Sequence, residues 1–147
     1  MTEISAQARP APKVSDVMAG PVICLDVEQP VSAATRLMRQ HRISDVVVTE
    51  AGRPVAVVSD RQLSARLASK SASESTSVGE VCPTEMITVA PEDDVRWAAV
   101  QMSKHSMRRL PVSADDAIVG FVSMGDVAGF FEGFTTTPDT GPHSRRV

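Results

Sequence analysis

The chain has 147 residues, of which 42% are hydrophobic and 22% are charged, and its formal net charge is −3. This composition is typical of a soluble globular protein, and the small acidic excess argues against general binding to nucleic acids. No apolar run approaches the roughly 20 residues of a membrane span, and residues 1–13 lack the apolar segment of a signal peptide. We therefore expect a cytoplasmic protein whose partners include neither a membrane nor a nucleic acid. Cys24 and Cys82 form no CxxC pair and predict neither a disulfide framework nor a metal site.

The chain contains an internal repeat. When the sequence is shifted by 64 residues, residues 14–63 align with residues 78–127 without a gap and are identical at 12 of 50 positions, against roughly three expected by chance. We therefore predict a first repeat at 14–68 and a second at 78–134. A Ser-rich linker at 69–77 joins them, and the tails at 1–13 and 135–147 lie outside the repeats.

Both repeats predict the same elements in chain order. A short helical turn (14–18 or 78–82) precedes a brief strand (22–25 or 86–89), in which we expect Cys24 to be buried. A helix follows at 28–41 or 91–105, with apolar residues at helical spacing and acidic residues at its entry. Two strands come next (45–49 and 54–59, or 109–113 and 117–123), and a last helix begins near Asp60 or Gly125. The order β-α-β-β-α, twice, predicts an α+β fold.

The last predicted strand of each repeat ends on a serine. The second repeat reads GFVSMGDV at 120–127, with Ser123 followed three residues later by Asp126. This spacing is typical of a helix cap, in which the serine and the carboxylate satisfy free backbone N–H groups. The same groups also suit a nucleotide, because a carboxylate accepts hydrogen bonds from both hydroxyls of a cis-diol and a helix start binds phosphate. The equivalent stretch at 56–63, AVVSDRQL, keeps Ser59 but has Ala56 and Gln62 in place of the glycine and the aspartate.

The element order, with HSMRRLPV at 105–112 and GFVSMGDV at 120–127, resembles a cystathionine-β-synthase (CBS) domain. Two such repeats in tandem resemble a CBS pair, or Bateman module, of the free-standing bacterial type. The resemblance implies two α+β units related by a pseudo-twofold axis, with two clefts between them. It also implies a non-catalytic regulatory module that binds an adenosine-containing ligand such as AMP, ADP or ATP, has no catalytic residues or cofactor, and acts on a protein that the sequence does not name.

The family's ligand motif is satisfied at every position of residues 120–126. The resemblance assigns Ser123 to a phosphate or ribose contact and Asp126 to the ribose hydroxyls, and a glycine at 120 lets backbone approach the ligand. Ile87 and Val122 are expected beside the base. In the first repeat, Ser59 and Gln62 predict a weaker, altered or lost site.

Charged residues near the expected clefts differ between the repeats. The resemblance implies that Arg108 or Arg109 reaches across the pseudo-dyad to a phosphate in the cleft of the first repeat. Asp45, at the position equivalent to Arg109, is expected near the cleft that contains Asp126, where it repels a phosphate, or else points elsewhere.

The remaining features concern partners. Trp97 falls off the apolar stripe of its helix, and Phe130, Phe131 and Phe134 follow near the end of the last one. Together with the resemblance, they predict a homodimer formed through helices. No nucleophile elbow, P-loop or HExxH motif is present, which argues against an enzyme. A protein-interaction scaffold without a physiological small ligand is the alternative function.

Overall fold

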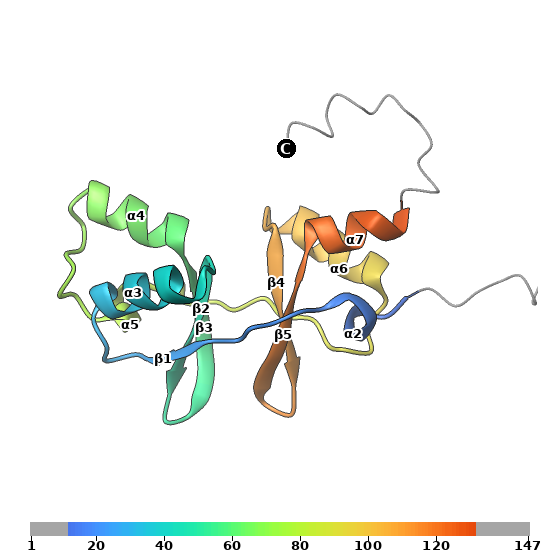
Figure 1. Cartoon of the computed structure of the whole chain (residues 1–147), viewed down its shortest axis with the longest axis horizontal. Helices are drawn as coiled ribbons and strands as arrows, with labels where there is room; N and C mark the ends of the chain where they lie inside the picture. Colours follow the sequence, from blue (N-terminus) through green and yellow to red (C-terminus); the bar gives the residue numbers. More distant parts are fainter. Residues whose placement is uncertain (1–11, 132–147) are drawn as a thin grey trace, which may run out of the picture.

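The computed structural model describes residues 12–131 and, in them, the side chains up to residue 129. Figure 1 shows two groups of strands and helices side by side, as the predicted α+β fold requires. The first group holds β1 (Cys24–Asp26), α3 (Val31–His41), β2 (Asp45–Glu50), β3 (Arg53–Ser59), α4 (Asp60–Ala68) and α5 (Val78–Val81). The second holds α2 (Val14–Val17), α6 (Val95–Lys104), β4 (Arg109–Ala114), β5 (Ala117–Ser123) and α7 (Met124–Phe131).

The first repeat has a three-stranded sheet in the order β1-β2-β3. β1 runs parallel to β2, and β2 pairs antiparallel with β3. Leu25 of β1 packs into the core, and strand alternation turns its neighbours outward, so Cys24 is exposed. The expectation that Cys24 is buried was therefore wrong, because Leu25 is the residue of β1 that points into the core and Cys24 points away from it.

The second repeat keeps only part of this sheet. Its first predicted strand is reduced to one parallel bridge, between Val89 and Val112. In the first repeat the N–H groups of Val47 and Val27 donate to this ladder, each at 2.9 Å. Their equivalents 64 residues later are Pro111 and Pro91, which have no N–H to donate. The two prolines thus explain why β4 and β5 form a two-stranded sheet.

Each short helix packs on the core of the other repeat. Val78 and Val81 of α5 are buried among the side chains of the first repeat, whereas Val14 of α2 is buried in the core of the second. Figure 1 shows the chain crossing from α2, beside α6, to β1 in the other group. The repeat in the sequence and the packed unit are therefore different sets of residues.

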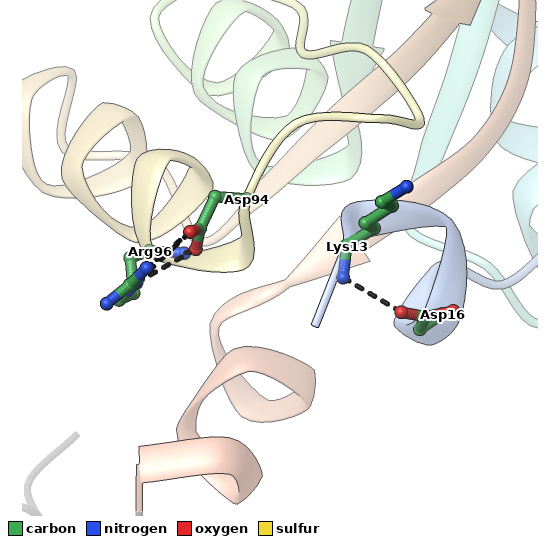
Figure 2. Close-up of polar contacts among 4 residues, drawn as sticks. All are labelled: Lys13, Asp16, Asp94 and Arg96. Atoms are coloured by element: carbon green, nitrogen blue, oxygen red, sulfur yellow. Dashed lines mark hydrogen bonds and ion pairs between the residues drawn. The ribbon is translucent and has the colours of Figure 1, made fainter. Parts of the chain in front are cut away.

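Backbone contacts hold these crossed segments in place. The N–H of Val14 donates to Asp93 O at 2.8 Å, and the N–H of Val78 donates to Gln29 O at 2.7 Å, so the two crossings are equivalent. Lys13 forms an antiparallel bridge with Asp94, which caps α6. Figure 2 shows Asp94 and its partner Arg96 at the start of α6, beside the turn that Lys13 opens.

The strands of the two repeats meet in the middle of the molecule. β3 contacts β5 there, and Val47 and Phe121 are 1% and 3% exposed although they belong to neither core cluster. They lie on the strand faces opposite the helices, because Val46, Val48 and Val122 fill the cores. Up to the bulges at Val48/Thr49 and Val112/Ser113, the face between the repeats therefore carries the odd-numbered residues of these strands, namely Asp45, Val47, Val57, Ser59, Arg109, Pro111, Phe121 and Ser123.

Candidate functional site

The predicted motif of the second repeat lies where β5 ends and α7 begins. The N–H of Asp126 donates to Ser123 Oγ at 3.1 Å, and the N–H of Ser123 donates to Asp126 Oδ2 at 3.1 Å. These two bonds form the capping arrangement that the spacing predicted. Asp126 is nevertheless exposed, and its second oxygen, Oδ1, makes no hydrogen bond within residues 12–131. The same carboxylate thus caps the helix and presents a free acceptor to the surface.

The first repeat has the same arrangement with an amide. Gln62 N donates to Ser59 Oγ at 3.1 Å, and Ser59 N donates to Gln62 Oε1 at 2.8 Å. An amide has one acceptor oxygen, and the cap uses it, so the exposed end of Gln62 presents chiefly donors. A carboxylate and an amide therefore both cap a helix here, but they offer different groups to a ligand.

Three apolar positions assigned to a ligand lie mainly inside the second repeat. Val122 is fully buried in the core and offers no surface, which corrects its assignment beside a base. Gly120 is also buried: a Cβ there would lie 3.2 Å from Met18 Sδ, so the space that this glycine leaves is taken by the segment after α2. Ile87 is half-buried against the same core.

Arg109 contacts the other repeat. Its Nε lies 2.9 Å from Asp45 Oδ2, and its guanidinium carbon lies 4.7 Å from the centre of the Phe121 ring. Nε is buried and makes no hydrogen bond, so the contact with Asp45 is an ion pair based on charge alone. Arg108 is exposed, and its backbone oxygen accepts the N–H of Met124 at 2.9 Å. Arg109, rather than Arg108, is thus the arginine at the boundary between repeats.

The surroundings of Asp45 shift the pKa of its carboxyl group. Burial raises the pKa of the Asp45 carboxyl above its ordinary value, and it does so although the charge of Arg109 and a hydrogen bond from Ser44 both lower it. The Ser44 hydroxyl lies 3.3 Å from Asp45 Oδ2. Withdrawal from water therefore outweighs the attraction of the partner.

Sequence reasoning missed this ion pair, although one signal was present. Residues 45 and 109 occupy equivalent positions of the 64-residue repeat, and two equivalent residues meet only on a pseudo-twofold axis. Two side chains of the same charge would repel each other there, whereas Asp45 and Arg109 carry opposite charges and attract each other. Opposite charges at equivalent positions were thus the sign that these strand starts touch.

Within residues 12–131, no helix is long and apolar enough to cross a membrane. The same residues contain no group of three or more His, Cys, Asp or Glu side chains that could hold a metal ion.

Comparisons with known proteins agree with the repeat. The family model described as CBS domain matches residues 14–69 and again residues 78–133. CBS domain-containing protein YhcV of Bacillus subtilis is 31% identical over 115 residues, which span 78% of this chain and 82% of the relative.

Solved structures have the same fold. A crystal structure of the CBS domain pair of protein MJ0100, in complex with 5′-methylthioadenosine and S-adenosyl-L-methionine, matches with a TM-score of 0.74 at 23% identity, over 86% of this chain and all (100%) of that one. Hypoxic Response Protein I with two coordinated zinc ions matches with a TM-score of 0.71 at 24% identity, over 80% of this chain and 97% of that one. The predicted resemblance is therefore confirmed, and this chain belongs to the CBS domain family, with two CBS domains in tandem.

Proposed function

We propose that this CBS pair is a non-catalytic sensor that binds an adenosine-containing ligand between its repeats, at the junction of β5 and α7. In this site Asp126 accepts hydrogen bonds from the ribose hydroxyls, and Ser123 contacts the ribose or its 5′ substituent. The observation that carries the proposal is the exposed Asp126 carboxylate with a free oxygen beside a helix start. The likeness to a CBS pair solved with two adenosine-containing ligands supports it.

We assign the stronger site to the second repeat. Gln62 already uses its acceptor oxygen on Ser59 N, so a ribose hydroxyl at that position meets donors in place of a charged acceptor. Asp126 keeps an oxygen free and carries a full charge. One strong site and one weak or empty site per chain are therefore expected.

Isothermal titration of the full chain with adenosine, AMP, ADP, ATP and S-adenosylmethionine tests this proposal. Asp126→Ala should weaken binding of the best ligand about tenfold or more, since hydrogen bonds to charged groups are the strong ones. The matched control is Gln62→Ala, which removes the same capping contact from the first repeat and should change the affinity less than twofold. No binding at millimolar ligand, or equal losses in the two variants, would refute the assignment.

The second candidate function is a protein-interaction scaffold. Trp97 and Val100 favour it, because these apolar side chains of α6 are 51% and 53% exposed. In this case a partner recovered with the full chain would bind equally with and without an adenosine derivative, and Trp97→Ala would weaken it.

The same face supports the predicted homodimer. Arg36 occupies the position in the first repeat that Val100 holds in the second, and Asp60 is the equivalent of the exposed Met124. A face with charges at these positions resists burial, so we propose that the second repeats of two copies pack together. Sedimentation should give a dimer that Trp97→Glu dissociates and Arg36→Glu does not. The phenylalanines also assigned to this contact lie outside the described side chains.

A further inference from the structure

The ion pair at the pseudo-dyad lies between the two serine motifs. Asp45 is the cross-strand partner of Ser59, and Arg109 is the cross-strand partner of Ser123. Asp45 Oδ2 lies 2.9 Å from Arg109 Nε, across the boundary between repeats. The starts of α4 and α7 are therefore connected by a row of four side chains, with the ion pair at its centre.

Arg109 is held in this row from two sides. Its guanidinium lies over the Phe121 ring at 4.7 Å, and its charge faces Asp45. The Asp45 side chain is only 14% exposed, whereas that of Arg109 is 37% exposed, so the carboxylate lies on the inner side of the pair. Arg109 is the cation paired in register with Ser123, and an internal anion already neutralises it.

A ligand phosphate at this place would meet two obstacles. It carries up to two negative charges, and Asp45 adds a third at close range. To pair with Arg109 Nε, it would also have to displace Asp45 and leave that largely buried carboxylate without its counter-ion, which is costly. An uncharged or positively charged 5′ substituent meets neither obstacle, because it leaves the ion pair intact.

We infer that Asp45 is a specificity-determining residue that excludes phosphate from the ligand site, so that the site takes adenosine derivatives with an uncharged or cationic 5′ group. This inference rests on the proposed function and narrows its ligand class. Asp45 does so by occupying Arg109, the group that would otherwise bind a phosphate by charge-assisted hydrogen bonds.

Titration of the full chain with adenosine and AMP tests the inference. The wild type should bind adenosine at least about tenfold more tightly than AMP, and Asp45→Asn should tighten AMP binding by about tenfold or more, the effect of one charge-assisted contact. Its affinity for adenosine should change less than twofold. Asp115→Asn removes the same charge at the far end of β4 and should leave both affinities unchanged. The double variant Asp45→Asn/Arg109→Gln should lose the gain for AMP.

The outcomes separate this inference from the proposed function. If the wild type binds AMP as tightly as adenosine, or Asp45→Asn leaves their ratio unchanged, the inference is wrong although the sensor stands. If neither nucleoside nor nucleotide binds, the proposed function fails. In that case, titration of the wild type and of Asp45→Asn with inorganic pyrophosphate tests the role of Asp45. Binding of pyrophosphate to Asp45→Asn and not to the wild type supports that role, and no gain overturns it. Asp45→Ser repeats each measurement should the asparagine variant not fold.

Discussion

The crossed packing of the short helices makes a prediction that distinguishes this fold from two self-contained repeats. Val14 lies in the first repeat of the sequence, yet it is fully buried in the core of the second. Replacement of Val14 by alanine should therefore weaken β4 and β5, which lie about a hundred residues later in the chain. Its twin Val78 is fully buried in the first core, and Val78→Ala should weaken β2 and β3.

The size of the effect follows from the side chain that is lost. Valine to alanine removes two methyl-sized groups at about 0.8 kcal/mol each, and a fully buried site adds a cavity cost, so we expect about 2 kcal/mol. If the affected amides exchange through opening of their own core, about 2 kcal/mol corresponds to roughly a 30-fold loss of protection.

Native-state hydrogen exchange measures this loss residue by residue. In Val14→Ala the protection of Leu110 and Val112 should fall more than that of Val46 and Val48, and Val78→Ala should show the reverse. The two variants are matched in residue type and in burial. If Val14→Ala instead lowers protection mainly in β2 and β3, each short helix packs on its own repeat and the architecture described above is incorrect.

Three further predictions concern single residues. Asp116 has φ +64° in the β4–β5 turn, where the first repeat has Gly52 at +80°, so Asp116→Gly should stabilise the protein by ~0.5–1 kcal/mol in urea unfolding; a loss of stability would contradict this. Because folding raises the pKa of Asp45 above its ordinary 3.8, the stability of the wild type relative to Asp45→Asn should fall as pH rises from 3.8 through the raised pKa, and an increase would show the opposite shift. The hydrogen bond with Arg96 lowers the pKa of Asp94 to about 2. The stabilisation of the folded protein by Asp94 should therefore be present above pH 3.8 and lost as pH falls toward 2. Asp94→Ala should then lower the melting temperature more than Asp94→Asn, since asparagine still caps α6, and equal losses would show that the cap contributes nothing.

Much of the fold was predictable from local patterns. The apolar periodicity predicted α3 and α6, and alternation predicted β2 to β5, because burial of one face depends on neighbours in the sequence. Pro91 and Pro111 were also visible in the sequence, and their missing N–H groups account for the reduced sheet of the second repeat. The exposure of Trp97 likewise followed from its place off the apolar stripe, and the structure confirms it.

The candidate site was predictable only in part. The spacing of Ser123 and Asp126 predicted their mutual hydrogen bonds, which depend on one helix start alone. The sequence could not predict which side chain fills the space beside Gly120. That side chain is Met18, which lies 102 positions earlier in the sequence. The resemblance assigned Arg108 or Arg109 to a phosphate, and that assignment stays a prediction, whereas the contact of Arg109 with Asp45 depends on how the two sheets meet.

By itself, the sequence determined that the chain is a tandem repeat of one α+β unit, with Ser-x-x-Asp in one copy and Ser-x-x-Gln in the other, since identity at a fixed shift and the side-chain periods are properties of the chain alone. Only the tertiary structure decided which core each short helix joins, because Val14 and Val78 have the same local pattern and either core could bury them. It also decided that Asp45 and Arg109 neutralise each other, since equivalent positions meet only when two repeats pack about a common axis. The net charge at the boundary between the repeats is set by that packing.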